Sequence, residues 1–246
     1  MFAVILGKNG EIMKAIYDWF VYQINITFIV DNRYRLFIEG FRNTLIIAAG
    51  AAVIGVFIGS IVAMVRVYHA QTGRLKIFDA ILGGYLALFR GTPIVVQLLI
   101  MYYIILRSVN NGLIVAVVAF GINSGAYVAE IVRAGIMSVD IGQTEAGRSL
   151  GLSAFKTLIL IIMPQAIKNI LPALGNEFVT LMKETSVAGY VAIRDLARAG
   201  ENVRSKTAEP YFSLLFIALV YFILVFLVSK LLKILERRLA RSDRNN

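Results

Sequence analysis

Apolar stretches long enough to cross a lipid bilayer recur five times along this chain of 246 residues, and they constrain its fold more than any other feature. The first runs without a charge from Asn43 to Val65, and the last covers Tyr211 to Lys230. The other three lie at about 77–106, 112–133 and 162–193. A helix needs about 20 predominantly apolar residues to span a membrane. The sequence therefore predicts an all-α polytopic membrane protein with five transmembrane helices.

Composition supports this class and excludes several others. Hydrophobic residues make up 59% of the chain and charged residues 16%, against about 45–50% and about 25% in soluble domains. Cysteine is absent and His69 is the one histidine, which excludes disulfides, a histidine or cysteine metal centre and a Ser-His-Asp triad. The net charge of +10 fits basic residues flanking membrane spans, so we expect a lipid bilayer and no nucleic acid as partner.

The residues before Asn43 differ from the rest, because aromatic side chains alternate there with charges. Such a sequence is typical of a helix lying along the membrane surface. A sixth span over residues 15–30 is the alternative, but it is short and weakly apolar. We expect an external or interfacial segment over 1–42, a transmembrane permease domain over 43–235 and a basic tail over 236–246.

The basic tail also decides the orientation, because positive charge accumulates on the cytoplasmic side of membrane proteins. We expect the N-terminus outside, the C-terminus in the cytoplasm and a cytoplasmic loop at about 136–163. Two spans carry helix breakers, namely Gly91 and Pro93 in the second and Pro172 and Gly175 in the fourth. Broken helices free backbone carbonyls for transport sites, so we expect a break at both places.

The polar connection between the third and fourth spans is patterned like a folded elbow. Thr144 can cap a short helix that begins at Glu145, Gly151 suits its C-terminal stop, and Ser153 can cap a second helix. The sequence predicts two short helices with the bend at Gly151. Physical reasoning alone leaves open whether the elbow binds a partner protein or only connects two spans.

The same connection resembles a known signature. Glu145, Ala146 and Gly147 are followed after three residues by Gly151, and after nine more by Ile161-Ile162-Met163-Pro164. This run is similar to the E-A-A-x3-G-x9-I-x-L-P signature in membrane subunits of bacterial ATP-binding-cassette (ABC) importers, with Gly147 and Met163 as departures. Residues 89–103, 124–139 and 171–190 also resemble permeases of the polar amino acid uptake family, which includes histidine, glutamine and arginine uptake systems.

The resemblance implies a multi-pass subunit of the bacterial inner membrane that dimerises with a second copy or a related permease. It also implies a separate ABC ATPase and an extracellular amino acid binding protein. The residues at the signature positions of the elbow, Glu145, Ala146, Gly147, Gly151 and Pro164, would form the contact with that ATPase and the bend. The chain has no G-x-x-x-x-G-K-[ST] phosphate loop. We therefore expect no enzymatic activity and no cofactor in this subunit, with ATP and Mg²⁺ bound by its partner.

Polar residues inside the spans are candidates for the substrate route. Glu177, Thr180 and Glu184 fall on one helical face, and two carboxylates there can hold an ammonium or guanidinium group. Arg90 and Gln97, seven residues apart, would share a face and meet a substrate carboxylate. This pattern favours a basic amino acid such as arginine, lysine or histidine.

Structural roles for these charges remain open from the sequence. Lys183 and Glu184 can pair locally, and Arg90 can clamp a glutamate. Glu130 and Arg133 fit an internal ion pair or an ATPase-side contact better than a ligand site.

We expect import by alternating access, driven by the separate ATPase. The main alternative is a secondary transporter coupled to an ion gradient. A second is a small ion channel, which would have an amphipathic pore-lining span and conduct without ATP. A third is a membrane-embedded enzyme, for which the sequence offers no catalytic triad, metal cluster or cofactor motif.

Overall fold

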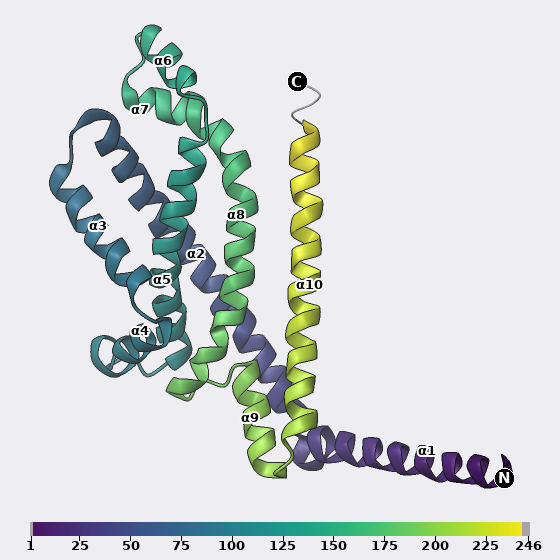
Figure 1. Cartoon of the computed structure of the whole chain (residues 1–246). Coiled ribbons are helices and arrows are strands. Elements are labelled where there is room, and N and C mark those ends of the chain that lie inside the picture. The colour runs from purple at the N-terminus through teal and green to yellow at the C-terminus, as the bar shows by residue number, and fades with distance from the viewer. Residues whose placement is uncertain (1, 243–246) are drawn as a thin grey trace.

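The computed structural model describes residues 2–242, and the side chains of residues 11–237. Long helices lie side by side in a bundle (Figure 1), and no strand occurs in the described range. The predicted all-α membrane fold is confirmed. The long helices are α2 (Tyr34–Thr72), α3 (Lys76–Gly91), α5 (Gly112–Met137), α8 (Met163–Glu184) and α10 (Pro210–Ser242).

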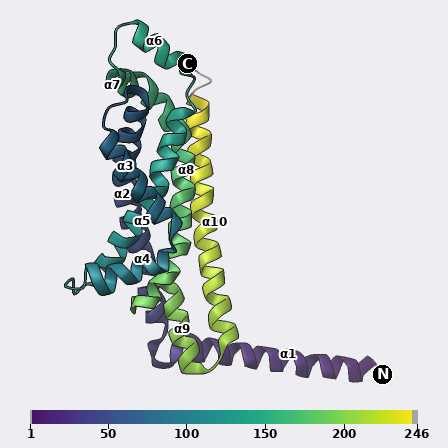
Figure 2. The same cartoon turned by 60° about the vertical axis from the view of Figure 1, so that its left-hand side comes forward.

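Shorter elements connect them. They are η1 (Asn25–Ile29), η2 (Val30–Asn32), α4 (Ile94–Ile100), η3 (Met101–Ile105), α6 (Ile141–Ser149), α7 (Ala154–Thr157), η4 (Leu158–Ile162), η5 (Thr185–Val191) and α9 (Leu196–Thr207). Among the described residues, four helices are long and apolar enough to cross a membrane, and the bent pair of α3 and α4–η3 brings the number to five when it is counted as one broken span. We call the two ends of the bundle the α6 end and the α9 end (Figure 2).

The first span is longer than its apolar core. Helix α2 begins at Tyr34, nine residues before Asn43, and continues to Thr72. Residues 34–42 are therefore part of the same helix as the span, and the domain boundary at residue 42 stays a prediction. Hydropathy marks the apolar part of a helix, whereas the helix itself continues wherever its backbone hydrogen bonds do.

Helices α2 and α5 form the centre of the bundle, and glycines let them approach closely. A Cβ on Gly55 would lie 2.8 Å from Ser124 Oγ, and one on Gly59 would lie 2.6 Å from Val128 Cβ. Small residues at such positions are the usual device for close helix contact in membranes. The Gly55-xxx-Gly59 pair therefore sets the distance between these two helices.

The second span breaks at Thr92–Pro93, as the sequence predicts. Helix α3 ends at Gly91, Pro93 is extended (φ −64°, ψ 135°), and α4–η3 leaves at 110° to α3. Proline disfavours a helical residue before it and lacks an N–H, which explains the position of the bend.

The predicted break at Pro172 is wrong. Helix α8 runs through Pro172 to Glu184, and α7, η4, α8 and η5 follow one another from Ala154 to Val191. Packing on both sides of the proline explains this: Ile170 packs against Gly135 of α5, and a Cβ on Gly175 would lie 2.6 Å from Leu232 of α10. Pro164 lies in the first turn of α8, where a missing N–H costs little.

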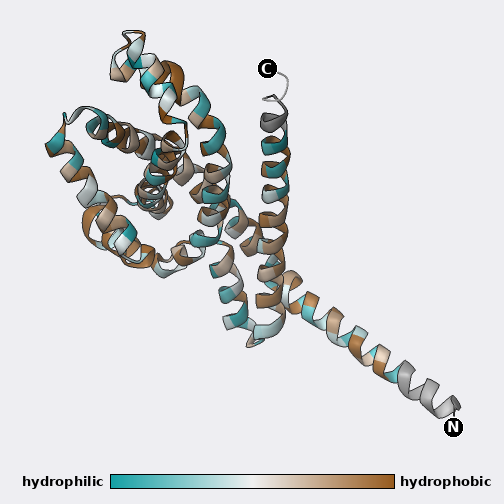
Figure 3. Ribbon diagram, turned by 45° about the horizontal axis from the view of Figure 1, so that its top comes forward, coloured by the Kyte–Doolittle hydropathy of each residue, from teal (hydrophilic) through white to brown (hydrophobic). Residues whose placement is uncertain are grey.

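The N-terminal segment forms α1 (Phe2–Ile24), which points sideways from the α9 end, roughly perpendicular to α10 (Figure 1). Its described side chains are mostly exposed, and apolar ones such as Ile16, Tyr17 and Trp19 are among them. Figure 3 shows apolar and polar residues interspersed along it. This direction fits the predicted interfacial helix and not a sixth span.

Candidate functional site

The acidic face of α8 lies where the sequence places it. Because α8 is continuous, Glu177, Thr180 and Glu184 follow one another along one side, and all three are half-buried. The Glu177 carboxylate accepts a hydrogen bond of 2.8 Å from Ser124 Oγ of α5. In the part of the chain that the structure describes, Lys183 is exposed and makes no ion pair with Glu184. The face therefore combines two carboxylates with two hydroxyl groups.

Gln97 is committed to partners within the protein. Its Nε2 donates to Phe89 O at 2.9 Å, Thr92 O at 3.0 Å and Thr92 Oγ1 at 2.8 Å. Its Oε1 accepts from Asn123 Nδ2 at 2.8 Å. Gln97 and Asn123 are both buried, and together they satisfy the backbone carbonyls that the bend between α3 and α4 leaves open. The sequence singled out Gln97 but not this pairing with Asn123.

Arg90 lies apart from Gln97. Their predicted common face does not exist, because the bend of 110° places them on different helices. The Arg90 guanidinium lies 3.8 Å from Glu130 Oε2 and 5.9 Å from the centre of the Tyr127 ring. Arg90 thus pairs with a glutamate, which is the structural role that the sequence left open for it.

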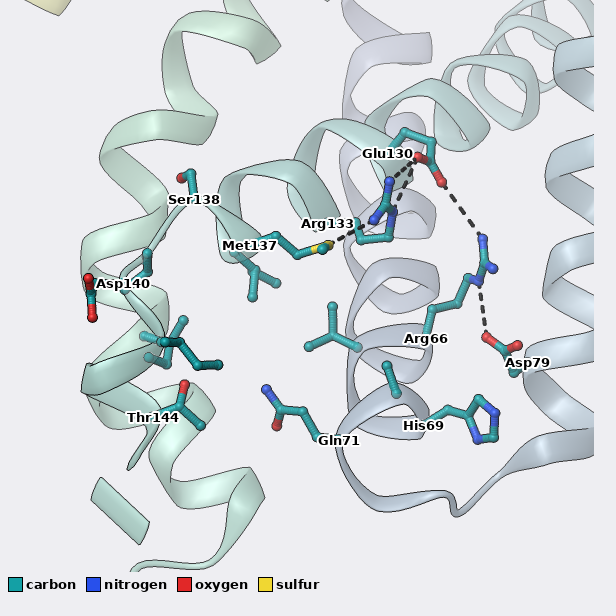
Figure 4. A pocket seen from close by; sticks show the side chains of 16 residues that line it. Arg66, His69, Gln71, Asp79, Glu130, Arg133, Met137, Ser138, Asp140 and Thr144 are labelled. Carbon is teal, nitrogen blue, oxygen red and sulfur yellow. Dashed lines mark hydrogen bonds and ion pairs between the residues drawn. The ribbon is translucent and has the colours of Figure 1, made fainter. Parts of the chain in front are cut away.

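Glu130 is the centre of an ion cluster at the α6 end (Figure 4). Arg133 Nη2 lies 2.9 Å from Glu130 Oε2, and Arg66 Nη1 lies 3.7 Å from Glu130 Oε1. Arg66 Nε also donates to Asp79 Oδ1 at 3.0 Å. This cluster ties α2, α3 and α5 together through charge. It confirms the internal ion pair of Glu130 and Arg133, whereas the sequence spacing gave no sign of Arg66 and Asp79.

A cavity of about 900 Å³ opens beside this cluster. Figure 4 shows Arg66, Glu130 and Arg133 on one side, with Asp140 and Thr144 across from them. Its wall therefore combines the ion cluster with the first turns of the elbow. A movement of α6 changes the shape of this cavity.

The elbow consists of two short helices, α6 and α7, as predicted (Figure 1). Gly151 takes the left-handed conformation (φ +82°) between them, and Ser153 Oγ caps α7 by accepting from Lys156 N at 3.3 Å. The predicted cap at Thr144 is wrong. Asp140 caps α6 by accepting from Gly142 N at 2.7 Å, so the helix begins at Ile141 rather than Glu145.

The signature residues divide between two faces of α6. Glu145 and Ala146 are exposed, whereas Gly147 is buried. A Cβ on Gly147 would lie 2.7 Å from Thr157 Cγ2, so glycine in place of alanine brings α6 close to α7. Leu150 is 81% exposed. The elbow therefore presents a carboxylate and a large apolar side chain outward.

Comparison with known proteins places this arrangement in a family. Residues 55–241 match the family described as "Binding-protein-dependent transport system inner membrane component". The chain belongs to this family. Inner membrane components of such systems are integral membrane proteins, in agreement with the apolar helices. The matched region begins after α1, so the family assignment rests on the bundle and the elbow.

Individual relatives and solved structures agree. A Rickettsia prowazekii protein named as a glutamine transport system permease is 39% identical over 82% of this chain and 92% of its own length. The arginine transport system permease protein ArtQ of Bacillus subtilis is 34% identical over 84% and 93%. A chain of an amino acid ABC transporter crystallised with histidines superimposes with a TM-score of 0.76 at 39% identity, over 85% and 96%. The MetNI methionine ABC transporter shares the fold, with a TM-score of 0.73 at 19% identity.

Proposed function

We propose that this inner membrane component is the permease subunit of an ATP-driven amino acid importer. Family membership supports an importer component, and the relatives named for glutamine and arginine transport support an amino acid as cargo. The elbow carries the proposal, because Glu145, Ala146 and Leu150 project from a folded pair of helices without a partner among the described residues. A separate ABC ATPase would dock there and move α6.

The first test is co-purification of the ATPase with the permease. We expect Glu145→Arg together with Leu150→Asp to abolish co-purification, because both side chains are exposed and their loss need not disturb the fold. Lys233→Gln with Arg237→Gln, on the exposed face of α10, serves as the control and should keep the ATPase bound. Replacing Gly151 provides a second test of the elbow. We expect this change to distort the bend between α6 and α7 and to weaken ATPase binding, because a φ of +82° does not suit other residues. If the ATPase stays bound both to the Glu145→Arg, Leu150→Asp variant and to the Gly151 variants, docking at the elbow is refuted.

For the cargo, we propose a basic amino acid such as arginine, lysine or histidine. Glu177, Thr180 and Glu184 form a half-buried acidic face on α8, and carboxylates at membrane depth favour a cationic ligand. The proposal assigns the carboxylates to the ammonium or guanidinium group of the substrate. Arg90 would contribute to carboxylate binding only if its contact with Glu130 opens, and Gln97 acts by holding the bend.

The second test compares uptake of arginine and glutamine. We expect Glu184→Gln to reduce the preference for arginine about tenfold, the loss of roughly one charge-assisted hydrogen bond. Glu236→Gln, near the opposite end of the bundle, is the matched control. Unchanged discrimination in Glu184→Gln would count against a basic substrate.

We further propose alternating access in a dimer, with the elbow, the ion cluster and the C-terminal tail on the cytoplasmic side and α1 outside. An extracellular binding protein would deliver the amino acid. Uptake that continues after ATP depletion and stops with the ion gradient would instead indicate a secondary transporter, which the names of the two relatives above do not support.

A further inference from the structure

Two hollows meet on the outside of the bundle at the α6 end, away from the acidic face of α8. One is an apolar groove of about 360 Å³ between α2 and η4, lined by Ile61, Met64 and Leu158 among others. The other is a polar pocket of about 540 Å³ between the end of α2 and the elbow. Tyr68 and Phe155 line both hollows, so the groove continues into the pocket.

The polar pocket is positively charged. Arg74 and Arg148 line it, hydroxyl groups come from Thr144 and Ser153, and no acidic side chain contributes to its wall. The Thr72 hydroxyl also lines it but is used within the protein, because it donates to Tyr68 O at 2.7 Å. Arg74 is exposed and its guanidinium makes no hydrogen bond or ion pair within the described range. Arg148 uses Nη1 for Leu152 O at 2.9 Å and keeps its other N–H groups. Two arginines with hydroxyl groups suit a phosphate.

The turn that carries Arg74 is fixed in place. His69 Nδ1 lies 2.6 Å from Arg74 O, and Arg74 N donates to Thr72 Oγ1 at 3.3 Å. Leu75 takes the left-handed conformation with φ +62°, which is unfavourable for a leucine, and its side chain lines the apolar groove. The turn thus directs one residue to each hollow, Arg74 to the pocket and Leu75 to the groove.

The apolar groove lies on an exposed part of α2, a helix long and apolar enough to cross a membrane. Ile61 is 48% exposed on a membrane-spanning helix, and it lies seven residues, or about 10 Å along the axis, from Tyr68. Tyrosine at such a position is typical of the boundary between hydrocarbon and headgroups. The groove therefore runs into the bilayer from a basic pocket at its surface.

We infer that the groove and the pocket together bind one anionic phospholipid. Its phosphate faces Arg74 and Arg148, and an acyl chain lies along α2 from Tyr68 toward Ile61. Because the pocket is also formed by Thr144 of α6 and Ser153 of the elbow, the lipid holds the elbow against the end of α2. The binding step depends only on membrane insertion, whereas an effect on ATPase coupling rests on the proposed function.

A fluorescence measurement on the full permease in lipid vesicles tests this inference. Trp19, the single tryptophan, is replaced by phenylalanine, and Phe155→Trp places a reporter where groove and pocket meet. Quenching by brominated phosphatidylglycerol is compared with quenching by brominated phosphatidylcholine. We expect about a 25-fold preference for the anionic lipid, because each of the two arginines near the membrane contributes about fivefold.

Variants assign the preference to the site. Arg74→Gln with Arg148→Gln should remove it, whereas Lys233→Gln with Arg237→Gln should leave it unchanged. Ile61→Phe narrows the groove without changing its charge, and we expect weaker quenching by both lipids. If the protein with Arg74→Gln and Arg148→Gln does not fold, the Ile61→Phe variant still tests the groove.

Several results would overturn the inference. They are equal quenching by the two lipids, a preference that survives in Arg74→Gln with Arg148→Gln, and displacement of the lipid by inorganic phosphate alone. Loss of quenching when the ATPase subunit is added would assign the pocket to protein docking instead. None of these quenching results changes the outcome of the ATPase co-purification test, so the lipid inference and the proposed function can fail independently.

Discussion

Asp195 is a carboxylate without exposed surface that starts α9 at the end of the bundle opposite the elbow. It accepts hydrogen bonds from Ala197 N at 2.9 Å and Arg198 N at 3.1 Å, and from the Tyr221 hydroxyl at 3.3 Å. Burial raises the pKa of this carboxyl above its ordinary value, and the hydrogen bonds only partly counteract that effect. One side chain thereby joins the helix cap of α9 to α10.

This pKa predicts a pH dependence of stability. The folded protein holds the Asp195 proton more tightly than the unfolded chain does. The resulting contribution of Asp195 to the free energy of unfolding is therefore full below the ordinary aspartate pKa of about 3.9, and it is lost as the pH rises above that value. Asp195→Asn keeps a capping side chain and removes the charge. We expect the melting temperature of this variant, relative to the unsubstituted protein, to increase from about pH 4 to about pH 7. A constant difference would contradict the assignment.

At this scale the sequence predicted the residues that obey local rules. Gly151 and Ser153 were predictable because a left-handed stop and a helix cap need only neighbouring residues. Asp140, rather than Thr144, caps α6, and both types of residue are acceptable caps. Local propensity could not choose between them, because the choice depends on where α5 ends.

At the scale of elements, the bend between α3 and α4 depends on Gln97 and Asn123. Gln97→Leu should lower the free energy of unfolding by about 2–4 kcal/mol, because Thr92 O loses its donor and the buried Asn123 amide keeps only its bond to Phe89 O. Thermal unfolding in detergent measures this effect. Gln165→Leu, where the side chain is exposed, should change little. Equal effects of the two substitutions would show that the bend is stable without Gln97.

The breaks in the spans illustrate the limit of prediction for elements. Proline predicted a break in both the second and the fourth span, but only the second has one. At Pro93 a glutamine supplies the hydrogen bonds that an open turn requires, whereas at Pro172 close packing by α5 and α10 keeps the helix straight enough to continue. These long-range contacts are not encoded in the local sequence pattern.

At the scale of the whole molecule, an aromatic cluster anchors the N-terminal segment to the bundle. The Phe28 ring lies 4.7 Å from Phe216 and 5.4 Å from Phe37, measured between ring centres. Phe28→Ala should destabilise the protein by about 2 kcal/mol, less than the 3–5 kcal/mol of a fully buried phenylalanine because Phe28 is half-buried.

Removal of residues 1–16 should leave the melting temperature unchanged, because it spares this cluster. Scanning calorimetry of both variants measures the contrast. A large loss on truncation, with little effect of Phe28→Ala, would mean that α1 itself supports the bundle.

The overall architecture was the most predictable level. Five apolar stretches, a folded elbow and an interfacial N-terminal helix follow from hydropathy and capping, which average over many residues. The ion cluster around Glu130 was not predictable, because Arg66, Asp79 and Glu130 come from three helices whose mutual rotation only packing decides. Spacing along one helix revealed only the pair with Arg133.

The sideways direction of α1 has a consequence for crowding in the membrane. With 23 residues it is about 35 Å long, comparable to the thickness of the bilayer itself. A helix in this direction enlarges the area that one copy covers as it rotates about the membrane normal, while it adds little mass. With α1 along the membrane surface, as the sequence predicts, we expect it to keep neighbouring proteins at a distance on that side and to slow the rotational diffusion of the permease.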